Sequence, residues 1–78
     1  MNNQEVRFNI LNKLYEKEIN SPGRGTSSAD LLKELSISEK DLDFNIRYLE
    51  DKYWVKLIKF LGGNFIANLT SEGIDLVE

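Results

Sequence analysis

The chain has 78 residues, of which 41% are hydrophobic and 29% are charged, and its formal net charge at pH 7 is −3. This length supports one domain over residues 1–78, because two shorter pieces would each be too small to bury a core. Cysteine and histidine are both absent, which excludes zinc fingers, disulfide scaffolds and catalysis by either side chain. The ten Lys and Arg residues are outnumbered by thirteen Asp and Glu residues, which argues against nucleic-acid binding.

No stretch of the sequence reaches the roughly 18 apolar residues needed to cross a bilayer, and the first five residues are polar apart from Met1. We therefore expect a soluble, cytoplasmic protein without a membrane partner. The acidic residues show neither the spacing of metal ligands nor a pair suited to acid–base chemistry. We expect a protein that is not an enzyme and that needs no cofactor or metal.

Residues 5–19 carry two apolar stripes with helical spacing and predict the first helix. One stripe recurs every four residues and is typical of a core side: Val6, Ile10 and Leu14. The second stripe lies on another side of the same helix: Phe8, Leu11, Tyr15 and Ile19. A helix that is apolar on two sides must be covered on two sides, so the second stripe needs either the C-terminal helix or another subunit.

Residues 20–26 form a loop, because a Ser-Pro-Gly sequence followed by a second glycine is typical of turns. Ser27 is suited to cap a short second helix over residues 28–35. The inner side of this helix is apolar: Leu31, Leu32 and Leu35. The two residues that follow it are too few for more than a tight turn.

Ser38 is suited to cap a longer third helix over residues 39–52, with acidic residues in its first turn where the helix dipole favours them. One side of this helix is predicted to pack inward: Leu42, Ile46, Leu49 and Tyr53. The opposite side is predicted to face outward: Lys40, Phe44, Arg47 and Asp51, flanked by Asp43 and Tyr48.

Residues 53–61 are rich in β-branched and aromatic side chains and predict a strand. The Gly62-Gly63-Asn64 sequence predicts a hairpin turn, and residues 65–69 form the returning strand. Thr70 and Ser71 are suited to cap a last short helix. Three helices, two strands and a final helix therefore predict a mostly helical α+β domain.

Residues 31–49, LLKELSISEKDLDFNIRYL, resemble the helix-turn-helix of the winged-helix superfamily. The resemblance continues through YLEDKYWVKLI, which is similar to the run from recognition helix into first wing strand. Tyr53 stands there in place of the glycine found in many small bacterial and archaeal transcriptional regulators. Residues 69–78, LTSEGIDLVE, resemble the family's segment after the wing. The resemblance implies a winged helix with a two-stranded hairpin as its wing.

The resemblance further implies a transcriptional regulator that binds double-stranded DNA. In this family the third helix, here 39–52, enters the major groove, and the wing, here 54–69, contacts the backbone or the minor groove. The implied DNA contacts are Lys40, Phe44, Arg47, Tyr48, Lys56, Lys59 and Asn64. Solvated surface charge is the alternative interpretation of Lys40 and Arg47. For Lys56 and Lys59 the alternative is protection of an exposed hairpin against edge-to-edge aggregation. Phe44 with Tyr48 would equally suit a protein partner, and coverage of Phe44 by the N-terminal segment is a further alternative.

Winged-helix repressors of this size usually act in pairs, because one small domain makes few phosphate contacts. We therefore expect a homodimer. Its predicted interface combines the second stripe of the first helix with the last helix: Phe8, Leu11, Tyr15, Ile19, Ile74 and Val77. The alternative function is a winged-helix module that binds a protein and no DNA, which the acidic balance of the chain favours.

Overall fold

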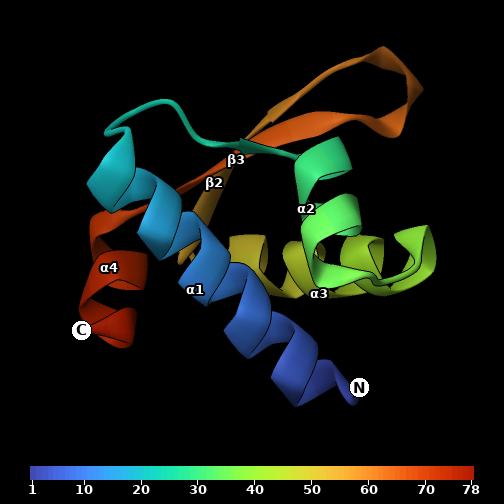
Figure 1. The fold of residues 1–78 in the computed structure, drawn as a ribbon, viewed down its shortest axis with the longest axis horizontal. Helices are drawn as coiled ribbons and strands as arrows, with labels where there is room; N and C mark the ends of the chain where they lie inside the picture. The colour runs from blue at the N-terminus through green and yellow to red at the C-terminus, as the bar shows by residue number, and fades with distance from the viewer.

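The computed structural model describes residues 1–78 and contains four helices and a three-stranded antiparallel sheet (Figure 1). The elements are α1 (Asn3–Asn20), β1 (Thr26–Ser27), α2 (Ser28–Leu35), α3 (Glu39–Asp51), β2 (Val55–Lys59), the 3₁₀ turn η1 (Leu61–Gly63), β3 (Phe65–Leu69) and α4 (Ser71–Val77). In the sheet, β3 lies between β1 and β2. The mostly helical α+β domain and the predicted order of its helices and hairpin are therefore confirmed, with β1 as an additional element.

β1 was not predicted, because two residues are too few to show a periodic pattern. Thr26 pairs with Ala67 and Ser27 with Ile66, so the end of the predicted loop becomes an edge strand. Gly25 makes this approach possible, since a Cβ there would lie 2.7 Å from the Ile66 side chain and 2.9 Å from the Ala67 carbonyl oxygen. The short strand fixes the start of α2 against the sheet.

The helix starts follow the predicted capping residues. Ser27 and Ser38 accept hydrogen bonds from the third residues of their helices, over 3.2 and 3.1 Å, and Thr70 does the same for α4 over 3.1 Å. α1 begins two residues earlier than predicted, because Asn2 and Glu5 form a reciprocal capping box. No helix combines the length and hydropathy that a membrane span requires.

The core lies between α1, α3 and the inner face of the sheet. Its buried apolar side chains are Val6, Ile10, Leu11, Leu14, Leu31, Leu42, Ile46, Leu49, Val55, Phe65, Ala67 and Leu69. The core stripe predicted for α1 is confirmed. α4 packs against α1, so the C-terminal helix covers part of the second stripe.

Tyr53 corrects the predicted inner side of α3. The helix ends at Asp51, and Tyr53 takes a left-handed conformation with φ of 62°. The prediction that it packs inward was wrong, because a residue in this conformation no longer follows the helical wheel, and 76% of Tyr53 is exposed. The position is the one at which the resembling regulators often have glycine, the residue that adopts positive φ at least cost.

Candidate functional site

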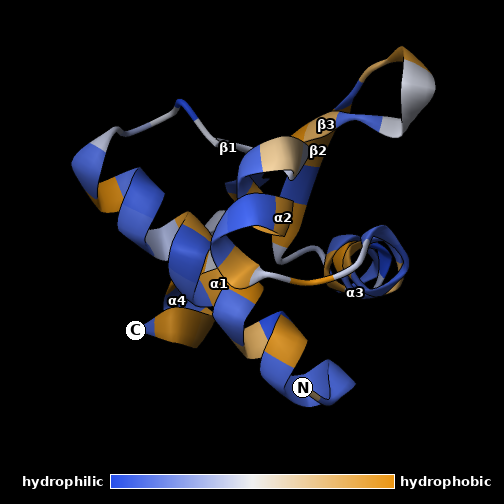
Figure 2. Cartoon of the chain, turned by 45° about the vertical axis from the view of Figure 1, so that its right-hand side comes forward, coloured by the Kyte–Doolittle hydropathy of each residue, from blue (hydrophilic) through white to orange (hydrophobic).

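α3 packs its apolar side into the core and leaves its opposite side open to solvent. Leu42, Ile46 and Leu49 are buried as predicted. Lys40, Phe44 and Arg47 are exposed, and 57% of the Phe44 side chain remains accessible. Figure 2 looks nearly along α3 and shows its largely hydrophilic outer side with no other element over it. This side is available to a partner without any rearrangement of the chain.

A shallow groove of about 960 Å³ runs over this outer side. Its lining residues are Asn3, Glu39, Lys40, Asp41, Asp43, Phe44, Arg47, Tyr48 and Asp51. The four carboxylates outnumber the two cationic side chains, so the groove itself carries negative charge. The structure thus gathers four of the predicted DNA contacts, Lys40, Phe44, Arg47 and Tyr48, in an acidic setting.

A second, smaller cleft of about 220 Å³ lies between α3 and the β2–β3 hairpin, and Arg47, Lys59 and Asn64 line it together. The ammonium nitrogen of Lys59 lies 3.4 Å from a carboxylate oxygen of Glu50, which connects the hairpin to α3. Arg47 lines both this cleft and the outer groove. Asp43 also lines both, so Arg47 is the cation through which the helix and the hairpin can contact one partner.

Lys56 is separated from the other predicted contacts. Successive side chains of a strand point to opposite faces, and Lys56 and Lys59 are three residues apart on β2. Lys56 lines a different cleft beside Asn68 and Thr70. The structure therefore brings Lys59 and Asn64 to the side of α3 and leaves Lys56 on the other face of the hairpin.

Tyr48 is half-buried because other side chains surround its ring. The guanidinium carbon of Arg7, on α1, lies 3.7 Å from the ring centroid, a close cation–π contact. Trp54 approaches the ring edge-on with 6.4 Å between centroids, and the ammonium of Lys52 lies 5.6 Å from the Tyr48 centroid. Only part of the Tyr48 surface is therefore open to a partner.

Asn45 is a fully buried polar residue of α3 that sequence reasoning missed. Its amide nitrogen donates to the Asn3 side chain over 3.1 Å and to the Asp41 carbonyl over 2.8 Å. Its amide oxygen accepts from Nε of Arg7 over 2.9 Å. These bonds fix the start of α1 against α3 and position the Arg7 side chain beside the groove.

The tip of the hairpin is apolar and exposed. Gly62 and Gly63 both have positive φ, which confirms the predicted turn, and the Phe60 amide donates to the Asn64 carbonyl over 2.8 Å. The exposed fractions are 52% for Phe60 and 98% for Leu61. The tip thus offers apolar surface beside the cleft that Asn64 lines, and Phe60 belongs to both.

The predicted dimer surface divides into exposed and covered residues. Phe8 and Ile19 are 66% and 61% exposed, whereas Leu11 is only 6% exposed and belongs to the core of the monomer. Leu11 therefore offers no surface to a second subunit, because it lies next to the core stripe, three residues before the buried Leu14. Three further members are half-buried against the core: Tyr15, Ile74 and Val77. The Tyr15 hydroxyl donates to Glu78 over 2.9 Å, which raises the pKa of Tyr15.

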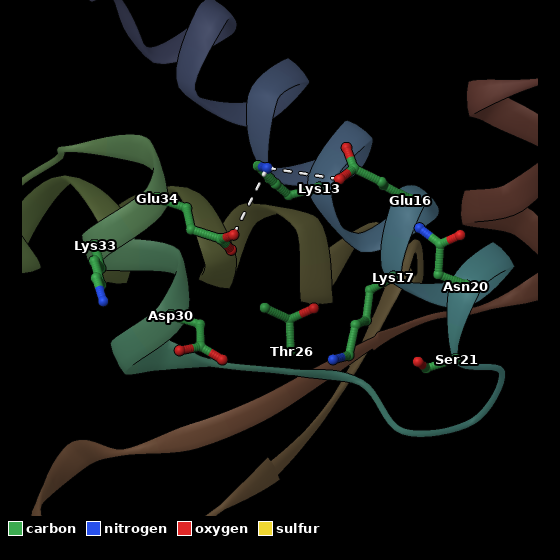
Figure 3. A pocket seen from close by; sticks show the side chains of 9 residues that line it. All are labelled: Lys13, Glu16, Lys17, Asn20, Ser21, Thr26, Asp30, Lys33 and Glu34. Atoms are coloured by element: carbon green, nitrogen blue, oxygen red, sulfur yellow. Dashed lines mark ion pairs between the residues drawn. The ribbon is translucent and has the colours of Figure 1, made fainter.

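A polar cleft of about 400 Å³ lies between α1, α2 and β1, away from α3 (Figure 3). In its wall, Lys13 lies 3.8 Å from Glu16 and 3.8 Å from Glu34, so the lysine connects α1 to α2. None of the lining residues is hydrophobic, whereas pockets for small organic ligands are mostly apolar. We therefore place the candidate site on α3 and the hairpin.

No family model matches the chain, and no curated protein matches its sequence. A solved structure does match: the crystal structure of a putative DNA-binding protein from Ralstonia eutropha JMP134. The TM-score is 0.83 and the sequence identity is 20%, and the match covers 94% of this chain and 90% of that chain. The likeness shows that the two proteins share a fold over nearly their whole lengths.

Proposed function

We propose that this chain is a winged-helix transcriptional regulator that binds double-stranded DNA without catalysing a reaction. The observation that carries the proposal is the position of Arg47, which lines both the open side of α3 and the cleft beside the hairpin. The fold shared with a protein described as DNA-binding supports the same function. In this arrangement α3 lies in the major groove, where Arg47 and Lys40 reach guanine edges or phosphates.

The β2–β3 hairpin serves as the wing. It projects beyond the helices in Figure 1, and its two glycines keep the tip narrow. Lys59 and Asn64, on the side that faces α3, contact a phosphate or the minor groove. Phe44 adds apolar contact with a thymine methyl group or a sugar.

The regulator acts as a homodimer in this proposal, because two copies double the number of phosphate contacts. The exposed Phe8 and Ile19 of α1 form the centre of the interface, and half-buried side chains flank them: Tyr15, Ile74 and Val77. Light scattering at tens of micromolar protein measures the mass directly. A monomer mass at that concentration would contradict the dimer. DNA binding by the single domain is tested by a separate experiment.

Fluorescence anisotropy with duplex DNA across a salt series tests DNA binding, and selection from a random DNA pool supplies the duplex. We expect affinity that falls steeply as salt rises. The variant Lys40→Ala/Arg47→Ala removes two exposed cations from the α3 face and should lose most of the affinity. Lys17→Ala/Arg24→Ala removes the same charge at the far end of α1 and is the matched control. Equal affinity for both double variants would contradict the assignment of α3 as the contact surface.

The charge of the α3 groove favours a second function, a protein-interaction module. The carboxylates of Asp41, Asp43 and Asp51 line the same groove as Phe44 and suit a partner with an apolar anchor flanked by basic side chains. The same salt series distinguishes the two functions. An absence of binding at about 50 mM salt, to the selected pool as well as to generic duplex, would favour the protein partner.

A further inference from the structure

Two cations that the proposed DNA contacts do not include lie around the same aromatic ring. Arg7 comes from α1 and Lys52 follows the end of α3, and both lie within 6 Å of the Tyr48 ring centroid, at 3.7 and 5.6 Å. We propose that Arg7 and Lys52 together hold a backbone phosphate of the bound duplex. This inference rests on the proposed function and names a contact site that composition and helical periodicity do not reveal.

Arg7 is already held in one orientation before any ligand binds. Its Nε donates to the buried Asn45 oxygen over 2.9 Å, and its guanidinium lies against the Tyr48 ring. Neither terminal nitrogen of the guanidinium is bonded to a protein acceptor or lies within 4.0 Å of a carboxylate. The four remaining N–H groups are therefore available, and a guanidinium presents them in the planar fork that matches phosphate oxygens. Little side-chain entropy is left to lose on binding.

Lys52 supplies the second charge. It is exposed, and among the lysines only Lys13 and Lys59 form an ion pair within 4.0 Å. Lys52 therefore has no carboxylate oxygen, that of the neighbouring Asp51 included, within 4.0 Å of its ammonium.

The position of this pair suits a phosphate of the DNA that α3 would enter. Tyr48 lines the outer groove of α3, so Arg7 and Lys52 stand at the border of the groove and not in its acidic lining. Backbone phosphates border the major groove and their contacts fix the register of a protein without reading bases. The pair would thus supply charge that the lining of the groove lacks, and would explain how a helix rich in carboxylates can still approach DNA.

The slope of affinity against salt concentration tests the inference, because each phosphate contact contributes about 0.9 to that slope on a double logarithmic plot. We expect Arg7→Gln/Lys52→Gln to reduce the slope by about 0.9, because the pair holds one phosphate. The control Lys17→Gln/Arg24→Gln removes the same charge elsewhere and should leave the slope near that of the unaltered chain. An unchanged slope in Arg7→Gln/Lys52→Gln would overturn the inference while DNA binding itself stands.

Arg7 also supports Asn45, so a loss of affinity alone could come from a disturbed α3. Arg7→Lys separates the two roles, because it keeps the charge and loses the planar stacking. We expect Arg7→Lys to bind more weakly than the unaltered chain but with nearly the same salt slope, and thermal unfolding to show that each variant is folded. If the unaltered chain shows no salt-dependent binding to the selected duplex, the proposed function fails and this inference fails with it.

Discussion

α3 and the β2–β3 hairpin border the same candidate site but are held in different ways. α3 is fixed along its length by buried apolar side chains and by Asn45, which makes three hydrogen bonds. The hairpin is buried at its base, where Val55 is 3% exposed, and open at its tip, where Leu61 is 98% exposed. The difference indicates that the contact surface of α3 has a fixed geometry. The position of the hairpin's contact surface depends on how the base of the hairpin is attached to the rest of the domain.

Of the substitutions that test this comparison, the one with the largest expected effect on stability is at the base of the hairpin. Gly73 of α4 packs so closely on the chain that a Cβ would collide with the Trp54 carbonyl oxygen and lie 2.9 Å from the Leu69 side chain. We expect Gly73→Ala to lower the free energy of unfolding by about 3 kcal/mol, because α4 must shift away from the start of β2. Urea unfolding of the variant measures the change.

Gly63→Ala is the matched control, since Gly63 has φ of 86° and a Cβ there would meet nothing within 4 Å. It should cost only about 1 kcal/mol of backbone strain. In a helix without neighbours, replacing glycine by alanine stabilises by about 1 kcal/mol. A stabilised Gly73→Ala protein would therefore show that the hairpin base is not held by this contact.

Asn45 tests the other side of the comparison, the support of α3. Asn45→Ala leaves Nε of Arg7 without its acceptor and removes two donated hydrogen bonds. We expect a loss of about 2 kcal/mol in the free energy of unfolding, because the former hydrogen-bond partners of Asn45 stay removed from water and have no replacement partner. Chemical denaturation beside the exposed Asn64→Ala variant provides the measurement and its control. Equal stability of the two variants would contradict a structural role for the Asn45 network.

These two regions also differ in how well the sequence predicts them. The buried stripe of α3 and its Ser38 cap follow from local spacing, and both were predicted. The Arg7–Asn45 bond joins residues 38 positions apart, and no local pattern marks such a pair. Asparagine is mostly a surface residue, and nothing in the local sequence marks Asn45 as buried. Its complete burial depends on partners that only the fold brings together.

In the hairpin, the two glycines were enough to predict the turn, because few other residues adopt positive φ. The separation of Lys56 from Lys59 was also available from the sequence, since strand residues an odd number of positions apart point to opposite faces. β1 was not available, because it exists only through its pairing with β3. The sequence therefore predicts which residues of α3 and the hairpin belong to the candidate site. Only the structure shows how they group into two clefts.

The connection between α3 and the hairpin passes through Tyr53 and supplies a smaller test. Its φ of 62° places a bulky residue in a conformation that glycine adopts without strain. Because 76% of Tyr53 is exposed, Tyr53→Gly removes few packing contacts. It should stabilise the protein by about 1 kcal/mol. The control is Lys52→Gly, where the backbone has φ of −82° and glycine should destabilise. Thermal unfolding of both variants would reveal opposite signs, and a destabilised Tyr53→Gly protein would mean that the tyrosine ring itself supports this connection.

The smallest effect on stability is expected for the wing lysines, and it distinguishes the two faces of the hairpin. Lys59 lies 3.4 Å from Glu50, but both side chains are partly exposed, at 66% and 31%, so Lys59→Ala should change the free energy of unfolding by no more than about 0.5 kcal/mol. Its effect on DNA binding should be clearer, with the salt slope reduced by about 0.9 if the lysine meets one phosphate. Lys56→Ala removes the same charge from the other face of β2 and should leave the slope nearly unchanged. Equal slopes for the two variants would mean that the hairpin attracts DNA through its total charge, and the side facing α3 would then have no special part in the contact.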